Sequence, residues 1–241
     1  MRGPAKPVQY FLVSGGSAPS DSSPGPVDVG VAKAQDYIRL RVLESGGRVS
    51  RTKAFEPAEA LDRAMDLFWR QGYSETVLDE LVRQTRASRY GLYATFGGKR
   101  DLFLGVLERY SQAIMDPMIG GLEDSQASAG EIRRFFVRLL GVIRRRGGRR
   151  GCLMCNTAFE RGPIDSAAAA RVRRHFDRVR RLLARALANA RRDGALADGL
   201  AVPAYADHLL GAAAGSFFLA RSGLPMTLVR RFVDTALRGL S

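Results

Sequence analysis

Apolar residues recur every three or four positions along most of the chain from Phe55 onward, which is the spacing of amphipathic α-helices. The first helix predicted in this way has Pro57 in its first turn and ends at Gly72. Its apolar stripe consists of Leu61, Ala64, Met65 and Phe68.

Two short helices and a longer one are predicted next. Thr76 is the expected N-cap of the second helix, because Asp79 three residues later completes a pair that resembles a capping box. Ser88 is the expected N-cap of the third helix, which runs through Tyr93. After Gly97-Gly98, a fourth helix carries apolar residues at Leu102, Phe103, Val106, Leu107 and Tyr110.

The remainder of the chain has the same helical texture. Helical spacing is found at residues 131–145, 152–161, 166–192, 203–221 and 225–240. Glycine, proline and Asp-Gly signals separate these segments. No segment alternates with the period of two that is typical of a strand. The sequence therefore predicts an all-α protein.

The first 50 residues have a different composition, rich in glycine, proline and serine. Such a segment buries too little apolar area to offset the entropy of ordering it, so a flexible extension is expected at residues 1–50. It is either an arm that follows DNA or a dispensable tail, including one that results from a misplaced start codon. Two folded parts are expected after it, at residues 51–112 and 113–241.

The net charge of +14 suggests a polyanionic partner. The excess of basic residues lies mostly between Arg133 and Arg192, in the C-terminal half. Arginines on solvated helix faces in a GC-rich genome explain this excess equally simply. Charge alone therefore does not indicate a nucleic-acid-binding protein.

Several features indicate a cytoplasmic location. Two cysteines cannot form a disulfide framework, which favours a reducing compartment. The longest nearly uncharged apolar stretch, residues 209–220, is too short for a bilayer span of about 20 residues. The N-terminus lacks the layout of a signal peptide, and no membrane partner is expected.

The second and third predicted helices, joined by a tight turn, have the pattern of a helix-turn-helix. Residues 54–110 closely resemble the N-terminal domain of TetR-family (TetR/AcrR-like) transcriptional regulators, most specifically in the run Leu92-Tyr93-x-x-Phe96-x-x-Lys99-x-x-Leu102. The rest of the chain fits the family's ligand-binding and dimerisation domain in length and class, and its Gly151-Cys152-Leu153 opening is similar to one branch of the family. The resemblance implies a three-helix DNA-binding domain at residues 51–112, with its motif at about 78–97, and a C-terminal helical domain.

The capped third helix would present its first turn to the major groove. Arg89 can bond to guanine or touch only phosphate, and Tyr90 can contact a thymine methyl or a phosphate. Glycine would let the backbone approach closely at position 91. The resemblance further implies phosphate contacts from Tyr93, Lys99 and Thr76, although the Tyr93 ring could pack in the core and Lys99 could be simply solvated. The full set of expected DNA-binding residues is Thr76, Ser88, Arg89, Tyr90, Gly91, Tyr93 and Lys99.

The match to the family has departures. Arg86 stands at the turn position that usually holds glycine, so a strained left-handed backbone is expected there. Ala87, Val77, Tyr90 and Gly91 are also unusual at their positions. These departures bear on the operator sequence and on some backbone contacts, and not on the fold.

A small-molecule effector is expected in the C-terminal domain, as the resemblance implies. Apolar residues at helical spacing, most of them methionine or phenylalanine, are candidate walls of its pocket, although plain core packing explains them as well: Met115, Met118, Phe135, Phe136, Leu139, Met154, Phe159, Phe176 and Val179. His175 and His208 are isolated, and no third or fourth metal ligand lies at zinc spacing. No catalytic motif is found either, so no metal, no cofactor and no enzymatic activity are expected.

Cys152 and Cys155 follow the arginine-rich segment 144–150 at the start of a predicted helix. The helix dipole and the arginines would lower a thiol pKa there and favour the thiolate. One interpretation is a redox-sensing switch in which oxidation or an electrophile at Cys152 releases DNA. The alternative is that both are small buried apolar residues.

The last two predicted helices carry apolar and small residues suited to a four-helix interface around a two-fold axis. Ordinary packing within one chain is the alternative, and the resemblance favours the interface. The candidate dimerisation residues are Leu209, Leu210, Ala212, Gly215, Phe217, Phe218, Leu228, Phe232 and Leu237.

Taken together, the sequence predicts a homodimeric repressor of transcription that binds a palindromic operator in double-stranded DNA. A small molecule or a thiol-reactive compound would release it. Two alternatives remain open at this stage. One is an all-α carrier or enzyme with a hydrophobic pocket, and the other is a basic, non-specific binder of nucleic acid or membrane surfaces.

Overall fold

A computed structural model describes residues 55–145, 150–160 and 166–241. The predicted extension at residues 1–50 lies outside these ranges. Within them every regular element is helical, and the only strand-like feature is an isolated bridge between Leu196 and Leu240. The all-α prediction is confirmed.

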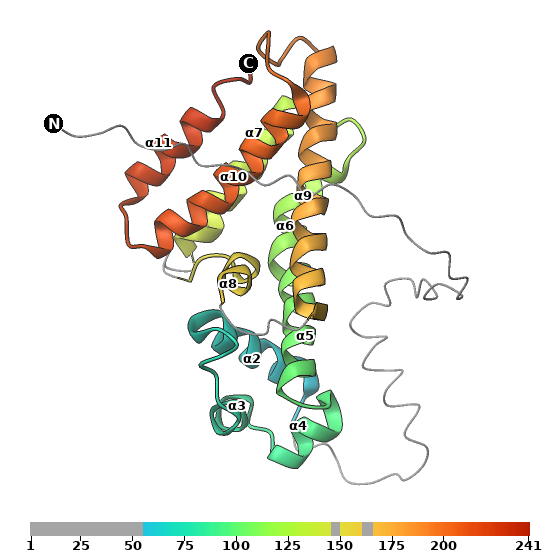
Figure 1. Ribbon diagram of the computed structural model, residues 1–241, viewed down its shortest axis with the longest axis vertical. Coiled ribbons are helices and arrows are strands. Elements are labelled where there is room, and N and C mark those ends of the chain that lie inside the picture. The colour runs from blue at the N-terminus through green and yellow to red at the C-terminus, as the bar shows by residue number, and fades with distance from the viewer. Residues whose placement is uncertain (1–54, 146–149, 161–165) are drawn as a thin grey trace, which may run out of the picture. The chain divides into compact units, whose positions relative to one another are not determined.

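The first four described helices form the N-terminal part of the chain, where α5 packs against α2 and α4, and α3 packs against the same two helices (Figure 1). Their bounds are α2 (Pro57–Gln71), α3 (Leu78–Thr85), α4 (Arg89–Phe96) and α5 (Lys99–Tyr110). Apolar faces hold them together: Phe68 of α2 meets Phe103 of α5 edge-on, with ring centroids 5.0 Å apart. The two short helices α3 and α4 are thereby fixed to a rigid pair formed by α2 and α5.

An irregular helical segment continues α5. It consists of a π-helical turn (Ser111–Met115), α6 (Asp116–Ile119) and a 3₁₀ turn (Gly120–Glu123). The sequence pattern predicts no element here, because Pro117 and Gly120-Gly121 interrupt the helical spacing. Apolar side chains nevertheless bury this segment against its neighbours, namely Ile114, Met115, Met118, Ile119 and Leu122.

Five helices form the C-terminal part. They are α7 (Ala129–Arg145), α8 (Leu153–Phe159), α9 (Ser166–Arg192), α10 (Val202–Arg221) and α11 (Met226–Ala236). α10 packs against α7, α9 and α11, while the short α8 packs against α9 and α5 (Figure 1). The predicted segments match these helices, except that α11 ends before Leu240. None of the described helices is both long enough and apolar enough to cross a membrane.

One buried contact joins the two parts. The Trp69 indole of α2 donates a hydrogen bond of 3.0 Å to the Gly151 carbonyl, just before α8, and its ring meets that of Tyr110 edge-on. The Arg150 guanidinium adds an ion pair to Asp66 of α2. The end of α2 is therefore tied to the start of α8, and this connection positions the candidate sites.

Candidate nucleic-acid interface and effector cavity

The first turn of α4 is locked by its cap. The Ser88 side-chain oxygen accepts a hydrogen bond of 2.9 Å from the Gly91 amide, which confirms the predicted N-cap. Just before it, Arg86 ends α3 with a φ of 57°, the left-handed backbone expected for a position that usually holds glycine. The turn between α3 and α4 is thus fixed by a cap on one side and a strained residue on the other.

Three of the predicted DNA-binding side chains project from α4 into solvent. The Tyr90 side chain is 83% exposed and Tyr93 is 49% exposed, so neither ring is part of the core. Arg89 is also exposed, and its guanidinium forms an ion pair of 2.5 Å with Asp79 of α3. A base-contacting Arg89 would have to exchange this carboxylate for its DNA partner.

Lys99 lies at the start of α5, next to the α2–α3 turn. Its ammonium group stands 4.4 Å from the centre of the Tyr73 ring, a cation–π contact. Partial burial lowers the pKa of Lys99, while the carboxylates of Glu160 and Glu75 oppose that shift. The positive charge is therefore anchored beside α4.

Two expectations for this region are corrected. Thr76 is fully buried, and its hydroxyl donates a hydrogen bond of 2.6 Å to the Gly72 carbonyl, so it neither caps α3 nor reaches a phosphate. The N-cap of α3 is Val77, which provides no side-chain hydrogen bond. At Gly91 a Cβ would lie 2.9 Å from the Phe55 ring. Packing within the chain therefore favours glycine at this position.

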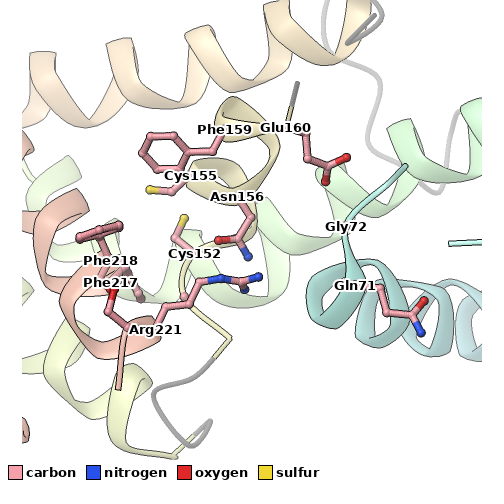
Figure 2. Close-up of a pocket in the computed structure, with 12 residues that line it drawn as sticks. Gln71, Gly72, Cys152, Cys155, Asn156, Phe159, Glu160, Phe217, Phe218 and Arg221 are labelled. Atoms are coloured by element: carbon pink, nitrogen blue, oxygen red, sulfur yellow. The ribbon is translucent and has the colours of Figure 1, made fainter. Parts of the chain in front are cut away.

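An outer cavity of about 470 Å³ lies where α2, α8 and α10 meet. Figure 2 shows its lining, which combines aromatic rings, two thiols and a guanidinium. The residues are Gln71, Gly72, Gly151, Cys152, Cys155, Asn156, Phe159, Glu160, Phe217, Phe218, Arg221 and Ser222. Because Gln71 and Gly72 end α2, a molecule in this cavity would touch both parts of the chain.

A smaller inner cavity, of about 30 Å³, lies deeper among the C-terminal helices. Its wall contains six of the nine predicted pocket residues: Met115, Met118, Phe135, Leu139, Phe176 and Val179. Phe159 lines the outer cavity instead, and Phe136 and Met154 are buried in the core without lining either of these two cavities. Cys152, Cys155 and Phe217 line both cavities and therefore separate them.

His175 also lines the inner cavity, although it stands isolated in the sequence. It is buried, and its Nδ1 has no hydrogen-bond partner among the described residues. Burial lowers its pKa to about 4, with Arg178 lowering it further and Asp116 opposing. A neutral imidazole therefore faces an apolar space.

Cys152 and Cys155 are both buried, and neither takes part in a disulfide. Interaction with the Cys155 thiol lowers the pKa of Cys152 to about 7, against the opposing effect of burial. The same interaction, with burial, raises the pKa of Cys155 well above its usual value. The Tyr110 hydroxyl also lies close to Cys152, and it has no hydrogen bond of ordinary geometry within the described ranges.

Glu160 follows α8 and was not identified from the sequence. Its carboxylate accepts hydrogen bonds from the Tyr73 amide at 2.8 Å, from the Ser74 amide at 3.1 Å and from the Ser74 hydroxyl at 3.3 Å. Gly72, with a φ of 87°, makes room for this carboxylate, since a Cβ would lie 2.5 Å from it (Figure 2). A lone glutamate after a short helix carries no sequence signal for a partner 87 residues away.

The candidate dimerisation residues fall into a buried group and a group that is exposed or half-buried. Leu209, Ala212, Phe217 and Leu237 are buried within the single chain, so they belong to its own core and cannot supply much interface area. Phe218 and Phe232 are 58% and 37% exposed, and the remaining three, Leu210, Gly215 and Leu228, are half-buried. Leu210 lines the inner cavity, so the apolar face that remains available on α10 and α11 consists of Gly215, Phe218, Leu228 and Phe232.

Two family models match the chain. Residues 60–106 match the model described as bacterial regulatory proteins, tetR family, and residues 129–235 match the model described as tetracyclin repressor-like, C-terminal domain. Together they span most of both helical parts. The boundary between the matches falls in the irregular segment after α5.

Relatives in sequence and in structure agree with these models. The HTH-type transcriptional repressor ComR of Escherichia coli is 29% identical over 78% of this chain and 90% of its own length, and the regulator YezE of Bacillus subtilis is 29% identical over 78% and 98%. The TetR-family regulator CifR, solved with a 26-base-pair operator duplex, is 27% identical with a TM-score of 0.64 over 80% of this chain and all of CifR. A regulator from Rhodobacter sphaeroides shares the fold at a TM-score of 0.68 and 23% identity, over 76% of this chain and 98% of its own.

Proposed function

The chain belongs to the TetR family of bacterial transcriptional regulators, and we propose on this premise that it is a repressor that binds a palindromic operator as a homodimer. Its fold is that of regulators and not of enzymes. The observation that carries the proposal is the capped, protruding first turn of α4, with Tyr90 almost fully exposed. Such a regulator acts on chromosomal DNA and therefore in the cytoplasm.

The chemistry of α4 supports a division of roles. Arg89 and Tyr90 stand at the first turn, where a recognition helix meets base edges, and we assign them to sequence readout. Tyr93 and Lys99 lie farther along and suit contacts to phosphate, which position the protein without reading sequence. Ser88 acts indirectly, by holding the first turn of α4 in shape.

A dimer is needed because a single short helix reads few base pairs. Two copies related by a two-fold axis would place two α4 helices on half-sites about one helical turn of DNA, roughly 34 Å, apart. The apolar face at Gly215, Phe218, Leu228 and Phe232 is the proposed contact, since a second copy would remove both exposed phenylalanines from water.

Release of the operator would follow from a change at the C-terminal helices. The outer cavity borders the end of α2, and six of the nine predicted pocket residues line the inner cavity. A small effector that favours an expanded cavity would shift the protein towards a conformation with different α4 spacing. A thiol-reactive compound at Cys152 or Cys155 is a second route to the same shift.

The decisive experiment is selection of bound duplexes from a random DNA pool at fixed salt. Wild type is expected to recover an inverted repeat, and Tyr90→Ala to recover a weaker or altered one. Val137→Ala is the matched control, because Val137 is an exposed apolar residue on α7, away from α4. Recovery of random sequence by wild type, or an unchanged repeat with Arg89→Ala and Tyr90→Ala, would contradict the proposal and favour a carrier or a non-specific binder.

A further inference from the structure

Cys152 and Cys155 face each other at one end of α8. Cys152 is the N-cap of this helix, and Cys155 lies in its first turn. Figure 2 shows both sulfur atoms beside the outer cavity, and the thiols are close enough to interact directly. A molecule small enough to enter a space of about 470 Å³ therefore lies beside two neighbouring cysteines, which are otherwise buried.

The two thiols differ in acidity. The pKa of Cys152 is lowered to about 7, so a substantial share is thiolate at neutral pH, whereas Cys155 keeps its proton. The Tyr110 hydroxyl, buried beside Cys152, offers a second donor to that thiolate. A nucleophilic thiolate and a resolving thiol thus share one site.

A covalent change at Cys152 would reach the DNA-binding part through α8. The Cys152 carbonyl accepts the Asn156 amide at 2.9 Å, and Glu160 follows only one turn later. Cys152 has the extended backbone of an N-cap, with φ −100° and ψ 128°, and a disulfide needs its Cβ about 4 Å from the Cβ of Cys155. Bond formation would therefore fix the N-cap of α8 to its first turn and restrain the helix that ends at the Glu160 carboxylate.

We infer that Cys152 and Cys155 form a reversible intramolecular disulfide when a small hydroperoxide enters the outer cavity, and that this modification weakens operator binding. The second half of the inference rests on the proposed function. The Glu160 contact with Tyr73 and Ser74 is the mechanical link between the modified turn and the helix-turn-helix.

The disulfide forms in two steps. The Cys152 thiolate attacks one peroxide oxygen, the O–O bond breaks, and the leaving alkoxide or hydroxide takes a proton to give an alcohol or water, leaving a sulfenic acid. The Cys155 sulfur, on losing its proton, attacks the Cys152 sulfur, the S–O bond breaks, and water leaves. Two thiols are oxidised by two electrons in total, and the peroxide is reduced by two. A dithiol reductant reverses the reaction by exchange.

The test treats the full-length protein with hydrogen peroxide at pH 7 and follows thiols and mass. Wild type is expected to fall from two free thiols per chain to none, with a mass lower by two hydrogen atoms, and to recover with dithiothreitol. Cys155→Ser is expected to hold a sulfenic acid that a 1,3-dione traps on Cys152. Cys152→Ser is expected to react far more slowly. Persistence of two thiols in folded wild type, or stepwise gain of oxygen without disulfide, would overturn the inference.

Operator affinity is measured on the same samples. The oxidised wild type is expected to bind its selected operator about tenfold more weakly or worse, a coupling of ordinary size. In Glu160→Ala the disulfide should form at the same rate while operator affinity no longer depends on it. If the oxidised wild type binds the operator as tightly as the reduced wild type, the proposed effect of the disulfide on operator binding is overturned. If the reduced protein selects no operator at all, the result instead contradicts the proposed function.

Discussion

The Glu160 carboxylate, at the end of α8, accepts the backbone N–H of Tyr73 through both oxygens, at 2.8 and 3.0 Å. Tyr73 lies in the turn that joins α2 to α3, so this contact joins the cavity-lining helix to the helix-turn-helix. Hydrogen bonds to a carboxylate are stronger than neutral ones, and here one side chain receives several. The contact therefore links α8 to the turn that precedes α3.

Replacement of Glu160 by alanine is expected to destabilise the fold by about 1–2 kcal/mol, because the turn amides lose a charged acceptor. Chemical denaturation of both proteins would measure the change. Glu75→Ala is the matched control, since Glu75 is an exposed carboxylate of the same turn, and it should have little effect. Equal effects of the two variants would show that only the local charge matters.

Arg86 offers a test of backbone strain. Its left-handed φ of 57° costs a non-glycine residue about 1 kcal/mol, so Arg86→Gly is expected to be more stable than Arg86→Ala by roughly that amount. Both variants lose the same exposed side chain, and their difference isolates the backbone contribution. Urea midpoints with an unchanged slope would measure it, and indistinguishable midpoints would rule out strain at this turn.

The ion pair between Asp79 and Arg89 is expected to restrain non-specific DNA binding. Asp79→Asn removes a negative charge next to α4 and frees the arginine, so binding to random duplex should tighten and its salt dependence should steepen by about one counterion. Affinity titrations at several salt concentrations would measure this. Asp198→Asn makes the same charge change at an exposed site before α10 and should leave the slope unaltered.

His175 is expected to make stability depend on pH. Its pKa is about 4 in the folded chain, against an ordinary value of 6.5 for an unfolded one, so between these values only the unfolded chain binds the proton. The contribution of the neutral His175 side chain to the free energy of unfolding is complete above about pH 6.5. It falls by about 2–3 kcal/mol as the pH drops towards 4. Arg178 and Asp116 face this imidazole, and burial dominates its pKa.

Urea denaturation between pH 7 and pH 5 would measure this loss. His175→Asn should flatten the dependence, while His208→Asn should not, because His208 is exposed and stacks on Tyr205. A wild-type stability that is constant over this interval would contradict the buried neutral state of His175.

Local sequence signals determined much of this protein. The spacing of apolar residues placed the helices, Ser88 marked the start of α4, and Arg86 marked a strained turn. Each of these depends on residues within one or two helical turns, where hydrogen bonds and side-chain spacing are fixed by the backbone itself. The run from Leu92 to Leu102 also indicated the family, which the two family models confirm.

Tertiary structure decided the rest. Thr76 has the sequence context of a cap, yet packing turned its hydroxyl inward to the Gly72 carbonyl. Four of the candidate dimerisation residues proved to be core, because the apolar stripe of a helix does not say which neighbour it meets. Glu160 contacts Tyr73, and His175 lines a cavity whose other walls come from distant helices. Such contacts between residues far apart in the chain exist only once the helices are packed.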